Sequence, residues 1–402
     1  MLLSMHKTTV RDFSDRDKRI GFHTGVSLHA HTHYSREVLS DLPAYILRVP
    51  VVAAWYEHQL RAYRAREGHC LDFSKGWWHP PVAPRAVFES EVRQIEERLE
   101  LWPLVSITDH DDLSAGFDLQ RLYASPRAPL SFEWTVPYAS GYFHLGLHNL
   151  PAAAADDWFR RLSAFTAQTS QEKLEDLLAD LNGRPDVLIV FNHPCWDLAA
   201  VGREEHEKQM RRFLAAYGTQ LHALELNGYR WHKENAAVRD LAAATGHPLI
   251  SGGDRHGCEP NALLNVTNAR SFAEFVAEIR DGLSHVLVMP EYRQHLATRM
   301  IASAADVMRW YRLYPAGQRH WTDRVTWDMG GSVRPLSFHW RDGGPLWVRG
   351  SVKVFQVISS PIVLRCIRAA LEAADGIRAR GSVGTASGTK PGIRTLGLGE
   401  AN

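Results

Sequence analysis

Residues 187–194 read Val-Leu-Ile-Val-Phe-Asn-His-Pro, an apolar run that stops at an Asn-His-Pro motif. Five consecutive large apolar residues are typical of a parallel strand that is buried on both faces. At three other places a strand-like run also ends in a short motif rich in His or acid, namely His29-Ala30-His31, Thr108-Asp109-His110 and Asp254-Arg255-His256. Because the carboxyl ends of parallel strands converge on one face of an α/β barrel, the sequence predicts that these motifs share one site.

Strand-like and helical patterns alternate through much of the chain. We expect strands at residues 25–28, 103–108, 129–133, 142–147, 186–191, 221–226, 247–251 and 285–289. Apolar residues at helical spacing predict helices at 88–99, 171–181, 204–217, 234–244 and 272–282. Strands that alternate with helices indicate a parallel sheet or barrel.

Other segments flank or interrupt this alternation. We expect a polar leader at 1–20, a barrel at 21–290 with an insertion at about 40–100, an extension at 291–375, and a flexible tail at 376–402. The insertion is far longer than an ordinary connection, and it would either cover the active face as a lid or pack as helices on the side of the barrel. In the extension, the pattern favours a strand at 347–358 and a helix at 362–374.

Composition limits the class of partner. The 402 residues include 46 Lys and Arg against 45 Asp and Glu, so no global charge favours nucleic acid or an anionic membrane. No run of about 18 apolar residues occurs, so we expect no transmembrane helix and no membrane partner. The four cysteines show no C-x-x-C spacing, which favours a reducing compartment, the cytoplasm.

The motifs contain the side chains that bind transition metals. In His29-x-His31 the two imidazoles point to the same side of an extended backbone, so both can bind one ion. Glu133 ends another apolar run, and His144 lies inside one. We interpret both as metal ligands rather than as a strand-end salt bridge and a core histidine.

The ordered set of motifs resembles the PHP family, which is named for polymerase and histidinol phosphatase domains, over roughly residues 20–290. The resemblance implies an α/β fold, a distorted (β/α)7 barrel of the PHP type, with a long insertion after the first strand and a C-terminal extension. It also implies two or three divalent ions and the hydrolysis of phosphate esters. The ligands that it implies are His29, His31, His110, Glu133, His144, His193, Asp254 and His256.

The sequence departs from the family pattern at a ninth ligand. Family members often carry an acid or His shortly after the first motif, where this chain has Arg36. Glu37 is our preferred substitute, with His33 and Asp41 behind it. The alternative is a missing ligand and a two-metal site.

Two residues beside the ligands are candidates for catalytic roles. Asp109 would orient an imidazole or shuttle a proton, unless it only caps a strand end. Arg255, together with Arg36, would contact a phosphate, unless both are solvated surface residues. Divalent Zn²⁺, Mn²⁺ or Fe²⁺ would activate a water that attacks phosphorus, so no Ser or Cys nucleophile is needed.

The predicted function is therefore that of a metal-dependent phosphoric ester hydrolase. Its substrate would be a phosphomonoester or phosphodiester of a small molecule or nucleotide. One alternative is an amide or non-phosphate ester hydrolase that uses the same metal centre, and another is a non-catalytic binding module stabilised by metal. A nucleic-acid partner is disfavoured, because no basic cluster interleaved with aromatic residues stands out.

Overall fold

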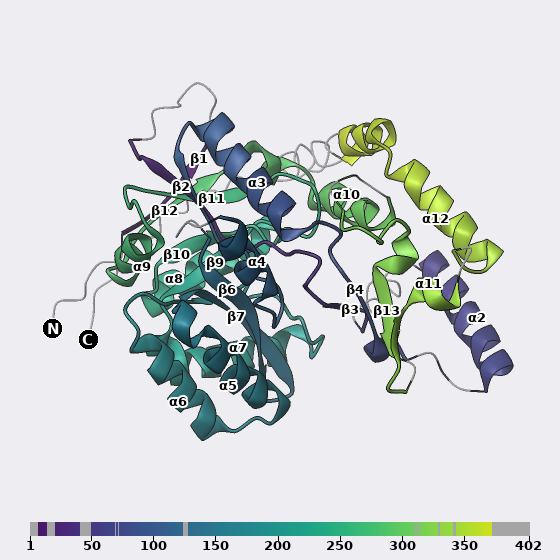
Figure 1. The fold of residues 1–402 in the computed structure, drawn as a ribbon, viewed down its shortest axis with the longest axis horizontal. Helices are drawn as coiled ribbons and strands as arrows, with labels where there is room; N and C mark the ends of the chain where they lie inside the picture. The colour runs from purple at the N-terminus through teal and green to yellow at the C-terminus, as the bar shows by residue number, and fades with distance from the viewer. Residues whose placement is uncertain are drawn as a thin grey trace, which may run out of the picture.

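The computed structural model describes residues 7–13, 21–40, 50–68, 70, 72–123, 128–309, 312, 314–328, 330–340 and 343–371. Two large mixed sheets form the body of the molecule, and a small third sheet lies to one side of them (Figure 1). Asp41 and the expected tail at 376–402 lie outside the described residues.

The first sheet has the strand order β1-β12-β11-β2-β5. Its strands are β1 (Lys7–Asp12), β2 (Thr24–Ser27), β5 (Trp102–Val105), β11 (Leu263–Thr267) and β12 (Leu283–Val288). β11 runs antiparallel to both β12 and β2, whereas β1 pairs with β12 and β2 with β5 in parallel. β1 lies inside the range 1–20 that the sequence set apart as a leader, and β11 was not predicted.

The second sheet has the order β10-β9-β8-β7-β6. It contains β6 (Leu130–Tyr138), β7 (Gly141–Leu150), β8 (Leu188–Phe191), β9 (Ala223–Asn227) and β10 (Leu249–Gly252). β8, β9 and β10 are parallel to one another, and β7 is antiparallel to its two neighbours. The mixed α/β class that the sequence predicts is confirmed.

The strands do not form one closed hydrogen-bonded barrel in the described residues. In place of a ladder, two isolated backbone bridges link the two sheets. One joins Ala30 to Arg255 beyond the ends of β2 and β10, and the other joins His110, after β5, to Glu133 of β6. The physical reason is that β2 already has ladder partners on both edges, β11 and β5. β10 therefore forms no ladder with the first sheet, and it contacts that sheet through side-chain hydrogen bonds, such as those from Leu249 N to Thr8 Oγ1 and from Ser251 N to Asn265 Oδ1.

The helices cover the outer faces of these sheets. α3 (Pro84–Gln94), with its π-helical end Ile95–Leu99, and α4 (Ser114–Leu122) pack on the first sheet. α5 (Ala155–Ala167), α6 (Gln171–Asn182), α7 (Arg203–Tyr217) and α8 (His232–Thr245) pack on the second sheet. Between the sheets, Val26, Leu104 and Ile250 meet Phe272 and Phe275 of α9 (Phe272–Arg280), which fills the interior with apolar side chains.

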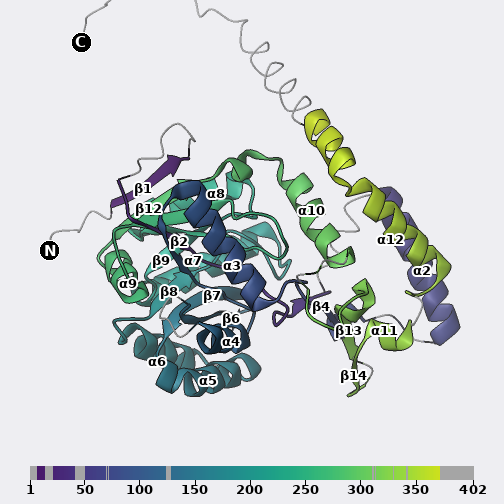
Figure 2. The ribbon, with the colours of Figure 1, turned by 45° about the horizontal axis from the view of Figure 1, so that its top comes forward.

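The insertion and the C-terminal extension build the third sheet together. Its antiparallel order is β14-β13-β4-β3, from β3 (Glu37–Val38), β4 (Gly76–Trp78), β13 (Val325–Asp328) and β14 (Val333–Pro335). α2 (Pro50–Glu67), α10 (Leu296–Met308), α11 (Leu336–His339) and α12 (Leu346–Ile358) surround it (Figure 2). The insertion thus contributes both a helix on the side of the body, α3, and a strand of this sheet, β4.

The expected strand at 347–358 is wrong, because this segment is the helix α12. Its alternating Val residues imitate a strand pattern. In the helix, however, Val348, Gln356 and Ser359 fall on one face. This face packs on α10, where Gln356 Nε2 donates to the carbonyl of Met308 at 3.0 Å. Within the described residues, no single helix is long and apolar enough to cross a membrane. One pair, Leu346–Ile358 with Pro361–Leu371, passes the same length and composition test together and is bent by 66°.

Candidate metal centre

The loops after β2 and β10 place the first and last motifs against each other. Backbone hydrogen bonds join His31 N to the carbonyl of Arg255 at 2.8 Å and Asp254 N to the carbonyl of His29 at 2.6 Å. His29 and Asp254 both have a positive φ, 63° and 52°, and so does His193 at 30°. Non-glycine residues rarely adopt this conformation, and such strain clusters at functional sites.

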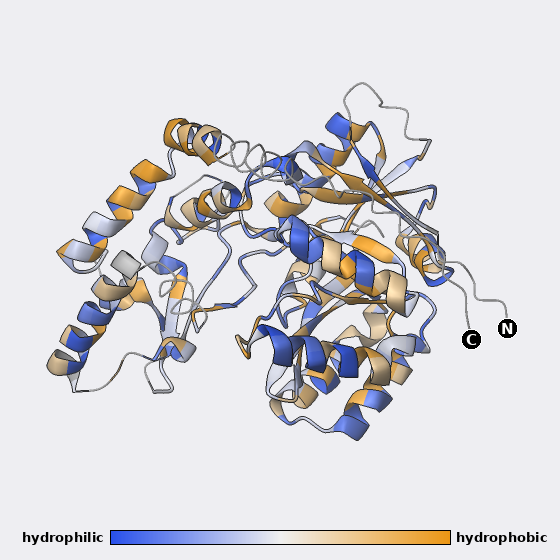
Figure 3. Cartoon of the chain, turned by 180° about the vertical axis from the view of Figure 1, so that it is seen from behind, coloured by the Kyte–Doolittle hydropathy of each residue, from blue (hydrophilic) through white to orange (hydrophobic). Residues whose placement is uncertain are grey.

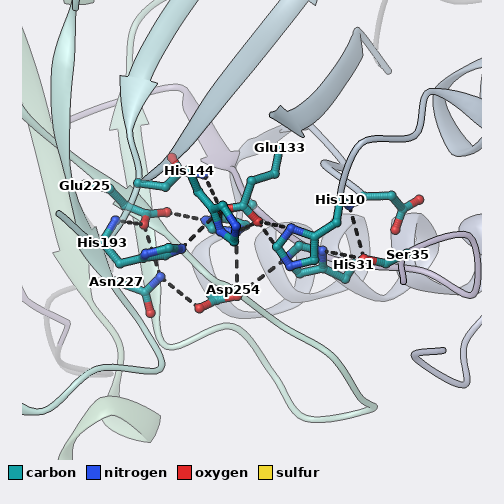
Figure 4. A network of polar contacts seen from close by, with 12 residues as sticks. His31, Ser35, His110, Glu133, His144, His193, Glu225, Asn227 and Asp254 are labelled. Carbon is teal, nitrogen blue, oxygen red and sulfur yellow. Dashed lines mark hydrogen bonds and ion pairs between the residues drawn. The ribbon is translucent and has the colours of Figure 1, made fainter. Parts of the chain in front are cut away.

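Glu133, on β6, lies at the centre of the cluster and is fully buried. Its two carboxylate oxygens face five imidazoles, as Figure 4 shows for the labelled residues. Asn192 Nδ2 also donates to its Oε1 at 2.9 Å. The five nitrogen–oxygen distances are 3.1 Å to His29, 3.5 Å to His31, 3.1 Å to His110, 3.2 Å to His144 and 3.1 Å to His193.

Asp254 and Glu37 add two further carboxylates. Asp254 Oδ1 lies 3.4 Å from His31 Nε2 and 3.6 Å from His256 Nδ1. Glu37 lies 3.4 Å from His110 Nε2 and 3.3 Å from His256 Nε2. The structure therefore brings Glu37 beside the other eight predicted ligands.

All nine predicted ligands fall into four overlapping groups, in each of which the donor atoms lie within 4.8 Å of one another. The groups are His31, Glu37, His110 and His256; His29, His31 and Glu133; His29, His193 and Asp254; and His110, Glu133 and His144. Sets of three or four His and carboxylate donors at such spacing are the ones that bind divalent transition metals.

The carboxyl groups of the cluster remain ionised although burial opposes ionisation. The surrounding imidazoles outweigh burial and hold the pKa of Glu133 well below its usual range. The same balance lowers the pKa of Asp254 and of Glu37. Three carboxylates, those of Glu133, Asp254 and the partly buried Glu37, thus lie ionised within one site.

The imidazoles of the cluster divide into two kinds. Burial disfavours the charged form, but nearby carboxylates overcome it and raise the pKa of His110 to about 10 and of His256 to about 9, and they also raise the pKa of His29. For His31 and His144 burial dominates and lowers the pKa to about 3 and about 4. The latter two are neutral donors near pH 7, the form that binds a metal.

Two of these nitrogens also serve as a test of whether the site fits a metal. His31 Nε2 and His144 Nδ1 are buried, and although carboxylate oxygens lie 3.2–3.5 Å away, neither nitrogen makes a hydrogen bond of suitable geometry in the described residues. An unpartnered buried nitrogen is costly, and a metal ion would remove that cost. The donor chemistry and these orphaned atoms both fit divalent ions.

A supporting shell that the sequence analysis missed orients the ligands. Glu225 Oε1 lies 2.5 Å from His29 Nδ1, and Asn227 Nδ2 donates to Asp254 Oδ2 at 3.1 Å. Ser35 Oγ donates to Glu37 at 2.8 Å and accepts from His110 N at 3.1 Å. The available sequence signal was Glu225 itself, an acid inside the apolar run 221–226.

Asp109 faces away from the imidazoles. Its two carboxylate oxygens accept hydrogen bonds from the backbone N of Thr32 at 2.5 Å and from Thr32 Oγ1 at 2.7 Å. Burial raises its pKa to about 7, and the bonds from Thr32 partly oppose this. These contacts correspond to the alternative in which Asp109 only caps a strand end.

Arg255 does not face the cluster, which corrects the expectation that it contacts a phosphate. Its guanidinium lies 3.0 Å from Glu91 Oε1 and donates to Ser90 Oγ at 2.7 Å, and both partners belong to α3. The residue is 3% exposed. The guanidinium of Arg36 instead lies over the ring of Trp77, 5.6 Å from its centroid.

Fold and site together define a mixed α/β protein with a buried His/carboxylate cluster of metal-binding type. No family model matches the sequence, and no curated protein matches it. Some solved structures are similar to the chain. PsfC from Pseudomonas syringae has a TM-score of 0.38 and 14% identity, over 55% of this chain and 90% of that one.

Two further solved structures are similar at the same level. A two-domain protein from Bacteroides vulgatus that contains a predicted PHP-like metal-dependent phosphoesterase has a TM-score of 0.36 and 12% identity, over 68% of this chain and 66% of that one. An amidohydrolase from Chromobacterium violaceum with bound sulfate has a TM-score of 0.28 and 15% identity, over 58% of this chain and 87% of that one. Likeness at these TM-scores does not assign a function to this chain.

Proposed function

We propose that this protein is a metal-dependent hydrolase that cleaves a phosphate ester of a small molecule or nucleotide. The observation that carries the proposal is the convergence of nine His and carboxylate donors into four overlapping groups. A structural zinc site needs only four ligands in one tetrahedral group. A site with more donors, arranged around shared carboxylates, is typical of centres with several catalytic ions.

The groups indicate which residues would hold each ion. His29, His193 and Asp254 would hold one ion, His110, Glu133 and His144 a second, and His31, Glu37 and His256 a third. Glu133 belongs to two groups, so its two oxygens suit a bridging role. When bound, Zn²⁺, Mn²⁺ or Fe²⁺ would supply acidified water as nucleophile and neutralise the charge on the ester.

The residues of the chain would bind and orient the substrate. Arg230 is a candidate for the phosphate contact, because its guanidinium lies 3.5 Å from the centroid of the Trp196 ring, which in turn lies 5.1 Å from that of His193. Arg230 Nε is buried and has no hydrogen-bond partner in the described residues. We assign to Arg230 the phosphate contact that was expected of Arg255.

The third sheet would border the substrate on the other side. Trp78, on β4, lies opposite Glu37 in the strand register, and its ring centroid lies 5.9 Å from that of His256. An aromatic wall beside the ions would exclude water and contact the substrate. This placement favours the lid function for the β4 part of the insertion.

We further propose that the two sheets represent the distorted (β/α)7 barrel of the PHP type. The support is the order of the strands that carry the cluster. β2 and β5 are neighbours in the first sheet, β6 to β10 follow one another in the second, and the two isolated bridges link both ends of this series. The antiparallel β7 and the added β11 account for the distortion.

The test is turnover of matched substrates by metal-loaded protein. Generic phosphomonoesters, phosphodiesters and carboxylate esters would be compared with added Mn²⁺ or Zn²⁺, with Glu133→Gln as the inactive control. We expect hydrolysis of a phosphate ester only, and a KM roughly ten- to a hundred-fold higher in Arg230→Ala, from loss of a charged hydrogen bond. Turnover of the carboxylate ester alone would identify the alternative hydrolase. Metal binding without any turnover would favour the binding module.

A further inference from the structure

We propose that the C-terminal helical arm, defined as residues 346–371, binds the surface of an anionic lipid bilayer. The arm consists of α12 and the helix Pro361–Leu371. In Figures 1 and 2 the arm lies away from the two large sheets, and its first helix, α12, lies beside α2. This inference is independent of the proposed catalytic function.

An exposed apolar stripe runs along α12. Leu346, Val354 and Val357 are 82%, 59% and 63% exposed, and Trp347 and Ile358 are also exposed. At roughly 100° per residue these five positions fall within about 120° of the helix circumference. The stripe is separate from the face of α12 that packs on α10.

The second helix continues this character, since Ile362 is 74% exposed near its start. In the hydropathy colouring of Figure 3, apolar residues recur along both helices of the arm. Isolated exposed apolar residues are ordinary, but a continuous exposed stripe marks an interaction surface.

The charges of the arm select an anionic partner. Residues 346–371 contain four cations, Arg349, Lys353, Arg365 and Arg368, and no Asp or Glu, although the whole chain has a net charge of only +1. Lys353 lies at the border of the stripe, and Arg349 lies one turn before it. Apolar residues flanked by Lys and Arg are typical of helices that lie in the plane of a membrane interface.

A cationic cavity beside α12 strengthens this charge argument. It has a volume of about 540 Å³, and its lining includes Arg309, Arg319, Arg349, Lys353 and His320. The described residues that line it include no acid. The arm would lie on the membrane and not cross it. The proposal departs from the sequence-based expectation of no membrane partner, which rested on the absence of a transmembrane helix and on the charge of the whole chain, whereas the cations here are local.

The experiment is cosedimentation of the full chain with lipid vesicles. Vesicles of phosphatidylcholine alone are compared with vesicles that also contain phosphatidylglycerol, at low and high salt. We expect at least about ten-fold stronger partitioning into the anionic vesicles at low salt, and weaker partitioning at high salt. Equal partitioning into both kinds of vesicle, or none, would overturn the proposal.

The variants address the stripe and the charges separately. We expect the double variant Val354→Ser/Val357→Ser to lower partitioning into the anionic vesicles about ten-fold. We expect the same of the single variant Lys353→Glu. The matched control, Leu122→Ser on α4, removes an apolar residue that is 56% exposed on the body and should not change partitioning. Because all these positions are exposed, circular dichroism and thermal unfolding should match those of the wild type.

Two further measurements test for other binding partners of the arm. If the stripe instead joins two copies of the chain, light scattering will show a dimer that the double Val variant dissociates, without vesicle binding. If the cavity binds only soluble phosphate, inorganic phosphate will protect the chain against thermal unfolding while anionic vesicles do not. Either result would refute the membrane assignment.

Discussion

His29 and Glu225 are joined by a short contact, 2.5 Å between the imidazole Nδ1 and a carboxylate oxygen. The other oxygen of Glu225 accepts a hydrogen bond from the backbone N of His193 at 2.8 Å. One carboxylate on β9 thus holds the first motif and the Asn-His-Pro motif in a single arrangement. Gly252 on the neighbouring strand makes room for it, because a Cβ at that position would overlap the carboxylate.

This relationship predicts the effect of Glu225→Gln. The carboxylate fixes the orientation of the His29 ring and increases its basicity, so we expect metal affinity to fall about 10- to 100-fold while the fold persists. Calorimetric titration of metal-free protein with Zn²⁺ measures the change. Glu207→Gln, on the exposed face of α7, is the matched control. An affinity equal to that of the wild type would show that Glu225 does not orient a ligand.

Metal removal should lower thermal stability. Ions that bind only the folded state add about 2.7 kcal/mol at a hundred-fold excess over Kd, so chelation should lower Tm and excess Mn²⁺ or Zn²⁺ should restore it. Scanning calorimetry at several metal concentrations measures this. Because Glu133 faces five imidazoles, Glu133→Gln should abolish most of the metal-dependent shift in Tm. A Tm independent of metal in the wild type would contradict the proposed centre.

Glu37 should determine the number of bound ions. Its carboxylate completes the group with His31, His110 and His256, so we expect Glu37→Ala to bind one ion fewer per chain than the wild type. Elemental analysis after dialysis counts the ions. His33→Ala serves as control, because His33 belongs to none of the four groups. An unchanged number of bound ions in Glu37→Ala would show that Glu37 is not a ligand and that the centre has only the other eight.

Arg255→Leu should act on stability. The residue forms a buried ion pair with Glu91, and removal of one partner from such a pair costs about 3–5 kcal/mol. Urea unfolding measures the loss, and Arg36→Leu, at a less buried site over Trp77, should cost much less. If Arg255→Leu keeps full stability and raises KM instead, Arg255 contacts the substrate after all.

His222 predicts a dependence of stability on pH that does not involve the metal centre. Burial, with the nearby Arg280, lowers its pKa to about 3, and its Nδ1 accepts a hydrogen bond from Ile189 N at 2.9 Å. In the unfolded chain the pKa of His222 is about 6.5, so between about pH 6.5 and about pH 3 the imidazole is protonated in the unfolded chain but neutral in the folded one. The contribution of His222 to the free energy of unfolding is therefore full above about pH 6.5 and falls as the pH approaches 3.

The measurement is urea unfolding of the wild type and of His222→Gln between these two pH values. The contribution of His222 should weaken by up to about 1.4 kcal/mol per pH unit, so the difference between wild type and variant should shrink as pH falls. Parallel curves for the two proteins would mean that His222 titrates normally in the folded state.

The strands that carry the cluster were predictable because they contain buried apolar runs. β2, β5, β8 and β10 end shortly before a polar motif, whereas Glu133 and His144 lie inside β6 and β7. β8 and its His193 are the clearest case. β11 was not predictable in the same way, since residues 263–267 are a short run whose strand character comes from pairing with β2 and β12, which are distant in sequence. α12 was misread because its alternating Val residues satisfy a strand pattern locally, and only packing on α10 decides for a helix.

The sequence by itself identified the residues that gather in the His/carboxylate cluster. All nine, including Glu37, are His or carboxylate residues in or beside short motifs, and these motifs can be recognised without a structure. The tertiary structure alone decided how the side chains are used. It places Glu37 through strand pairing with the insertion, directs Arg255 into α3, and brings Glu225 against His29. The physical reason is that residue type sets what a side chain can bind, whereas its direction and partners depend on packing between segments far apart in the chain.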